Sequence, residues 1–225
     1  MTEACKLNDH FGVFVDQEPA PRATFLDIQA AKAWADHFAG NARIYPVGYG
    51  RIEPLAWNDY MAWTAETAKY PEAGQTTLVA LNYAALELAS ETMELVVVVD
   101  DKAPSAVILD EAGDVAWALA RCFTESALLP LPSWHLDRCF VQRLVHWAAK
   151  AVGKIKTAQR CGDFDRRLTD PVWRADLAET LTAVLVHLQS FLRSHGLDLE
   201  TACGRNKAKL LARLAQGTLN ERPPT

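Results

Sequence analysis

The sequence lacks several features that would assign it to a class directly. No apolar run approaches about 18 residues, so neither a transmembrane helix nor a membrane partner is expected. The opening residues, MTEACKLNDHFG, have no basic start and no apolar core, so a signal peptide is not expected. The five cysteines are odd in number and form no CxxC pair. This pattern fits reduced thiols and predicts a cytoplasmic protein.

An excess of positive charge is also missing. The formal net charge is −5, which argues against a general nucleic-acid-binding protein. The GYG at residues 48–50 is too short for a phosphate-binding loop and predicts a turn. A zinc site made from Cys139, Cys161, His135 and His146 is disfavoured, because their spacing matches no common zinc finger.

The chain does contain two pairs of carboxylates with helical spacing. Glu91 and Glu94 form the first pair, and Glu111 and Asp114 form the second. Residues three apart lie on the same face of an α-helix. Pro104 lies between the pairs and favours a helical hairpin that brings the four acids together. The pairs on their own would fit a solvated acidic face. Crowded on largely apolar helices, however, they favour a hard cation such as Mg²⁺ or Mn²⁺.

A family resemblance supports the metal interpretation. ALELASETMEL and LDEAGDVAWALA resemble the Glu-x-x-Glu and Glu-x-x-Asp helices of the MazG-type all-α nucleoside triphosphate pyrophosphohydrolases. WNDYMAWTAETAKYPEAG resembles that family's opening helix and Tyr-Pro turn. The resemblance implies that Glu91, Glu94, Glu111 and Asp114 bind Mg²⁺, which holds the triphosphate and activates water. It also implies that Glu91 or Glu94 orients or deprotonates that water.

Two details depart from the family pattern. Glu87 stands where the family usually has a small residue. The four valines at 96–99 replace a polar, lysine-containing helix end, and β-branched residues favour a strand. The helix expected there is implied by the resemblance. Thr76 or Thr77 is expected to cap the helix with Glu91, and Ser105 the helix with Glu111.

The second half of the chain resembles the same two helices without their acids. LVHWAAKAVGKIKTAQRCGDFDRR is similar to the first metal-binding helix, and RADLAETLTAVLVHLQSFLRSHGLDL is similar to the second. Trp147 and Lys150 stand at the Glu-x-x-Glu positions, and Thr180 and Ala183 stand at the Glu-x-x-Asp positions. The resemblance therefore implies a second, degenerate site that does not bind Mg²⁺.

The C-terminal stretch supplies cations that the first half lacks. GLDLETACGRNKAKLLARLAQGTLNER resembles the family's last helix, with Asn206, Lys209 and Arg213 at its characteristic positions. Their spacings of three and four place them on one helix face. Charge alone would suggest a solvated basic helix, whereas the resemblance implies triphosphate binding. We hypothesise that this helix and the acids of the first half form one composite pocket. Its wall candidates are Asn82, Tyr83, Trp57 and Trp117.

The expected fold is all-α, a bundle of two MazG-like half-units forming a pseudo-dimer. Residues 1–54 form an N-terminal extension of unassigned role, 55–129 the unit with intact acids, and 130–225 the degenerate unit with the basic helix. Within the extension, helical spacing of apolar residues predicts a helix over Thr24–Ala39 with Thr24 as N-cap, after an extended or poorly ordered arm. NARIYP is expected to be a loop or short strand.

The expected function is Mg²⁺-dependent hydrolysis of a (d)NTP to the monophosphate and pyrophosphate. The alternatives are a non-catalytic nucleotide-binding regulator and a helical interaction module. The expected partner is the nucleoside triphosphate substrate, and a homodimer of the chain would give a tetramer-like assembly.

Overall fold

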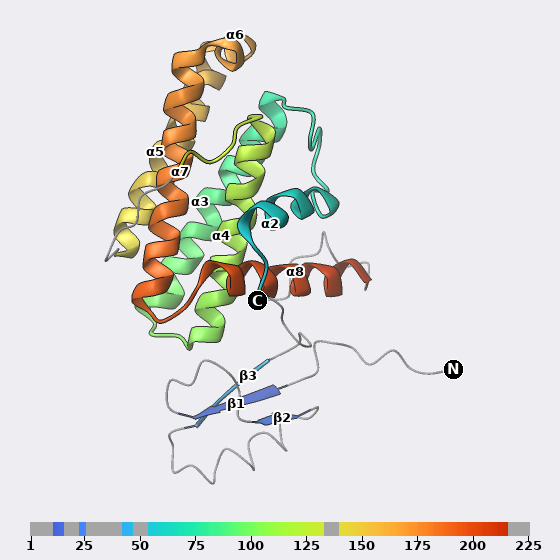
Figure 1. Ribbon diagram of the computed structural model, residues 1–225, viewed down its shortest axis with the longest axis vertical. Helices are drawn as coiled ribbons and strands as arrows, with labels where there is room; N and C mark the ends of the chain where they lie inside the picture. The colour runs from blue at the N-terminus through green and yellow to red at the C-terminus, as the bar shows by residue number, and fades with distance from the viewer. Residues whose placement is uncertain (1–10, 16–22, 26–41, 47–53, 133–139, 216–225) are drawn as a thin grey trace.

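The computed structural model describes residues 11–15, 23–25, 42–46, 54–132 and 140–215. From residue 54 onward the regular elements in this described part are all helical, which confirms the predicted all-α class (Figure 1). No described helix is both long and apolar enough to cross a membrane. The helices are α2 (Trp57–Trp63), the 3₁₀ helix η3 (Thr64–Glu66), α3 (Leu78–Asp100), α4 (Ser105–Glu125), α5 (Val141–Cys161), α6 (Phe164–Thr169), α7 (Pro171–Ser194) and α8 (Leu199–Ala215).

The N-terminal extension contains a small antiparallel sheet. Strands β1 (Phe11–Val15), β2 (Ala23–Phe25) and β3 (Ala42–Pro46) pair in the order β2-β1-β3. Thr24 lies in β2 opposite Gly12, so its predicted role as a helix N-cap is wrong. The backbone hydrogen bonds of strand pairing hold Thr24 extended instead. The rest of that predicted helix, the GYG turn, Cys139 and His135 lie outside the described residues.

The helical hairpin predicted around Pro104 is present as α3 and α4. Thr77 caps α3, because its Oγ1 accepts a hydrogen bond from the Ala80 amide at 3.2 Å. Pro104 takes the N-cap position of α4, so Ser105 is the first helical residue rather than the predicted cap. The four valines at 96–99 are helical, and three of them pack against the core. Tertiary packing therefore overrides their β propensity.

The core of the helical region is a four-helix arrangement. α3 packs against α4 and α5, while α7 packs against α5 and α4. One hydrophobic cluster joins the buried side chains of all four helices, including Leu88, Leu119, Leu144 and Leu181. α8 lies across this bundle and packs on α4, with α2 beside it (Figure 1). The expected boundary at 129–130 falls between α4 and α5, and the pseudo-dimer relation of the two halves stays a prediction.

Gly113 allows α8 to approach α4 closely. A Cβ atom at this position would lie 2.8 Å from the Ala202 carbonyl oxygen and 2.8 Å from Asn206 Cβ. These distances are shorter than real Cβ contacts, and the carbonyl oxygen belongs to rigid backbone. The absence of a side chain at Gly113 therefore sets the distance between the two helices.

Replacing Gly113 with alanine will destabilise the protein. Overpacking costs about 1–3 kcal/mol, and the better helix propensity of alanine offsets about 0.5–1 kcal/mol of that cost. We expect a net loss of about 1–2 kcal/mol in the free energy of unfolding, measured by urea denaturation. A Gly113→Ala variant as stable as wild type would contradict this account of the α4–α8 contact.

Candidate functional site

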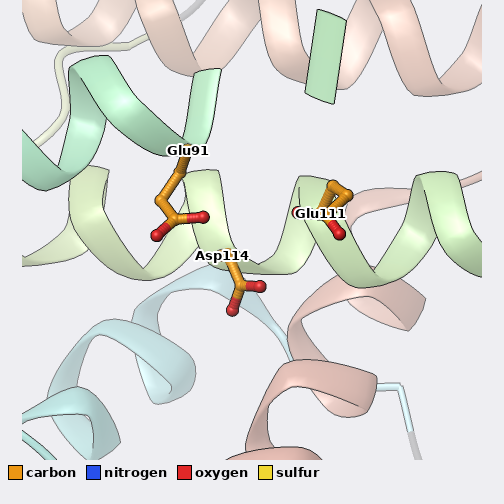
Figure 2. Close-up of side chains that lie close together, drawn as sticks. All are labelled: Glu91, Glu111 and Asp114. Atoms are coloured by element: carbon orange, nitrogen blue, oxygen red, sulfur yellow. The ribbon is translucent and has the colours of Figure 1, made fainter. Parts of the chain in front are cut away.

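Three carboxylates from the α3–α4 hairpin meet in one place. Glu91 projects from α3, and Glu111 and Asp114 project from α4 (Figure 2). One oxygen from each lies within 4.8 Å of the others, and all three residues are half-buried. We call this group the acidic cluster. Its donor set consists only of hard carboxylate oxygens, which suit Mg²⁺, Mn²⁺ or Ca²⁺.

The fourth predicted ligand lies outside the acidic cluster. Glu94 is exposed on α3, one helical turn beyond Glu91, and accepts a hydrogen bond from the Ser90 hydroxyl at 3.3 Å. The predicted four-acid group therefore contains three members that come together and one that stays at its edge.

The acidic cluster concentrates negative charge in a partly desolvated place. Burial raises the pKa of Glu91 to about 8, and the charges of Asp114 and Glu94 add to this rise. Burial likewise raises the pKa of Glu111 to about 7, with the charge of Asp114 as the next cause. Lys209 lowers both pKa values. A bound cation would relieve the remaining repulsion.

Helix α8 holds Asp114 by both of its oxygens. The Asn206 side-chain amide donates to Asp114 Oδ1 at 2.6 Å, and the Lys209 ammonium pairs with Oδ2. The Tyr60 hydroxyl donates to Asn206 Oδ1 at 2.7 Å, and both side chains are fully buried. Residues from the two halves of the sequence thus lie together around one carboxylate.

A second ion pair fastens α8 one turn earlier. Arg205 donates from Nε and Nη2 to the two oxygens of Asp110, both at 2.8 Å. Asp110 was not predicted from the sequence. The available signal was that Asp110 precedes Asp114 by four residues and so shares its helix face.

The other predicted binding residues are less central. Arg213 is half-buried and lies one turn beyond Lys209 on α8. Asn82 is half-buried on α3, nine residues before Glu91. At about 100° per residue, that separation places Asn82 on the opposite side of α3 from Glu91.

An aromatic network joins α3, α4 and the Tyr-Pro turn. The Tyr70 and Tyr83 rings stack with their centroids 4.4 Å apart, and the Trp117 ring meets Tyr70 edge-on. Burial raises the pKa of Tyr83, and the carboxylates of Glu87 and, to a smaller extent, Glu91 add to this rise. The fourth wall candidate, Trp57, packs on Tyr60 and Phe123 instead.

A buried ion pair supports this network. Arg121 and Glu125 pair within α4, and both are fully buried. Glu125 also accepts hydrogen bonds from the Tyr70 hydroxyl at 2.6 Å and from the Gly74 amide at 2.9 Å. The pair therefore ties the loop after the Tyr-Pro turn to α4. Sequence reasoning missed it.

The degenerate positions in the second half carry no such acids. Lys150 Nζ lies 4.4 Å from the centroid of the Trp147 ring, which also stacks on His187. Thr180 donates to the Asp176 carbonyl at 2.7 Å. Among the residues that the structure describes, the acidic cluster is the one group of three or more His, Cys, Asp or Glu side chains arranged to hold a metal.

The electrostatics of Glu91 predict a pH-dependent stability in the metal-free protein. Its carboxyl group has a pKa of about 8 when folded and about 4.5 in the unfolded chain. Between these pH values the folded protein binds more protons than the unfolded chain. The free energy of unfolding therefore falls as the pH rises toward about 8, where the buried Glu91 carboxyl loses its proton. We expect Glu91→Gln to be stabilising by about 1–2 kcal/mol near pH 8.5, a value reduced for partial solvent exposure, and nearly neutral near pH 4.5.

Thermal unfolding in chelator at the two pH values measures this effect. Glu179→Gln, on the exposed face of α7, is the matched control and should change little at either pH. Equal effects of Glu91→Gln at both pH values would contradict the prediction.

Comparison with known proteins gave no match of any kind. No family model matches the chain, and no curated protein or solved structure is detectably similar to it.

Proposed function

We propose that the protein is a Mg²⁺-dependent nucleoside triphosphate pyrophosphohydrolase acting in nucleotide-pool housekeeping in the cytoplasm. The observation that carries the proposal is the acidic cluster with Lys209 of α8 against it. A hard-cation site beside a fixed ammonium group is what a polyphosphate requires, because the metal and the lysine neutralise different phosphate oxygens.

The residues present fit Mg²⁺, with Mn²⁺ as a second candidate. Glu91, Glu111 and Asp114 offer oxygen ligands within 4.8 Å of one another, and their mutual repulsion favours a cation. When bound, Mg²⁺ supplies electrostatic stabilisation of the phosphate oxygens and a bound water of lowered pKa.

The chain's own residues then have separate roles. Glu94 lies exposed one turn beyond Glu91 and can orient the attacking water or accept its proton. The water oxygen bonds to the α-phosphorus while the bond from that phosphorus to the bridging oxygen breaks. The products are the monophosphate and pyrophosphate, which leaves with the electron pair of the broken bond. Lys209 stabilises the charge that develops on the phosphates.

One observation favours the alternative of a non-catalytic nucleotide-binding protein or interaction module. Lys209 and Arg205 already pair with Asp114 and Asp110, so α8 neutralises part of the acidic face without any metal. In that alternative α8 has a structural role only. Turnover separates the two functions.

The test is release of pyrophosphate and monophosphate from a panel of NTPs and dNTPs, with Mg²⁺ and with chelator. We expect turnover only with the metal, and a loss of about 10- to 100-fold in Glu111→Gln. Glu179→Gln, which removes an exposed α7 carboxylate, is the control and should retain full activity.

Two results would contradict the proposal. The first is no turnover on any nucleotide by folded wild-type protein. The second is turnover that survives both the chelator and Glu111→Gln.

A further inference from the structure

The outer face of α3 is apolar along most of its length. Its exposed apolar side chains follow one another at intervals of four and three residues, with Ser90 at the centre of the series. This is the heptad spacing of a helix that packs against another helix. The opposite face of α3 is already buried in the core. The exposed fractions are Val79 50%, Tyr83 39%, Leu86 67%, Met93 52% and Val97 56%.

The charges of α3 and of its neighbour α5 are fully segregated. α3 carries four acidic residues and no lysine or arginine, whereas α5 carries five lysines and arginines and no acid. The two helices pack side by side, yet between described residues no ion pair joins them. The α3 acids are Glu87, Glu91, Glu94 and Asp100, and the α5 cations are Arg143, Lys150, Lys154, Lys156 and Arg160.

Most of the positive charge on α5 therefore points to solvent. Lys154 pairs with Asp176 of α7, but Arg143, Lys150 and Lys156 are exposed. A surface that is apolar and acidic on one helix and basic on the next is complementary to itself.

Gly153 on α5 adds a second indication of a partner. Glycine in the middle of a helix costs about 0.5–1 kcal/mol relative to alanine. A Cβ atom on Gly153 would meet nothing within 4 Å in this chain, so no internal contact explains the residue. Gly153 and the exposed Ala149 lie four residues apart, so small residues follow one another on this face of α5. Small side chains on one helix allow the side chains of another helix to approach closely.

We propose that α3 and α5 form the contact face of a homodimer in which α3 of each chain lies on α5 of the other. A two-fold axis running along the helices produces this pairing twice, as symmetric dimers require. The apolar series on α3 then lies over Ala149 and Gly153 and covers the aliphatic stems of the α5 lysines. The α3 acids outside the metal site, Glu87 and Asp100, are then available to cations of the other chain.

The alternative two-fold axis is disfavoured by charge. An axis across the helices would place α3 on α3 and α5 on α5, with like charges facing each other. α2 and α8 pack on α4, so the contacts that α8 makes with Asp110 and Asp114 lie outside the proposed face.

Light scattering after size-exclusion chromatography of the full chain tests the proposal. We expect a mass of twice 24.9 kDa, falling toward one chain only on strong dilution. Leu86→Arg should weaken association at least about 100-fold, because it buries a charge in the apolar part of the contact. Val172→Arg is the matched control, since Val172 is an exposed valine on α7, outside the proposed face.

Gly153→Leu distinguishes close helix packing from non-specific apolar association. It enlarges the exposed apolar area, so it should weaken a closely packed dimer and strengthen non-specific association. Circular dichroism shows whether each variant is folded, and Lys150→Glu with Lys156→Glu gives an independent disruption by charge. A wild-type protein that is monomeric would overturn the proposal. This holds even if its α3 face binds a basic peptide, because the occupant would then not be a second copy of the chain. A dimer that all these variants leave intact would also overturn it.

Discussion

Replacing Lys209 with methionine is expected to lower turnover about 100- to 1000-fold while tightening the binding of Mg²⁺ alone about tenfold. The first effect follows from the loss of a fixed positive charge beside the phosphates, since removing one such group commonly costs that much in rate. The second follows from the ion pair between Lys209 and Asp114. Without the ammonium group, Asp114 regains its full negative charge for the metal.

The opposite signs of these effects make the experiment informative. A merely structural lysine would reduce activity and metal binding together, because both would follow from a disturbed α4–α8 contact. Mg²⁺ affinity can be measured without nucleotide by the rise in thermal stability with metal concentration. Asn206 still holds the other Asp114 oxygen at 2.6 Å, so the carboxylate keeps its position in the variant.

Lys207→Met is the matched control. Lys207 is on the same helix, but its ammonium lies over the Trp63 ring, 5.5 Å from the centroid. Removing it takes away the same charge at a place that does not touch the acids. Equal losses of turnover in Lys207→Met and Lys209→Met would contradict a specific role for Lys209.

The acid pairs show how far sequence periodicity reaches. The three-residue spacing of Glu111 and Asp114 placed both on one face of α4, and the turn at Pro104 brought α3 alongside. Spacing alone could not say that Glu94 stays exposed while Glu91 turns inward. Three residues correspond to about 300° around a helix, so partners in such a pair diverge by about 60°. This difference in direction leaves Glu94 at the edge of the acidic cluster and Glu91 within it.

Contacts between distant residues were less predictable. Arg205 and Asp110 are 95 residues apart, and the only local signal for their contact is that Asp110 shares a helix face with Asp114. The valines at 96–99 are a related case, because their local preference is for a strand and their burial decides for a helix. Thr24 shows the reverse error. The apolar spacing predicted the start of a helix there, but the residue lies in a strand that pairs with β1.

The pair Arg121 and Glu125 was invisible for another reason. In sequence it is an ordinary pair four residues apart, which on most helices is solvated and contributes little. In this chain both residues are fully buried, at 1% and 0% exposure. Burial depends on what packs over α4, namely the loop from Tyr70 to Gly74, and periodicity carries no information about that.

We therefore expect Arg121→Met to lower the free energy of unfolding by about 3–5 kcal/mol, a far larger effect than a surface pair would give. The methionine retains the length and apolar packing of the arginine stem. What remains is the Glu125 carboxylate, buried and without its counter-charge. Tyr70 and Gly74 still donate hydrogen bonds to it, but two neutral donors do not replace a guanidinium group.

A second substitution separates the buried charge from lost packing. Adding Glu125→Gln to Arg121→Met removes the uncompensated charge and keeps an oxygen to accept from Tyr70 and Gly74. Recovery of about 1–2 kcal/mol in the double variant, measured by urea denaturation, would identify the carboxylate as the main cost. A single variant that loses less than about 1 kcal/mol would show that the pair behaves as a solvated one. Because Tyr70 stacks on Tyr83, the single variant should also loosen the contact between the Tyr-Pro turn and α3.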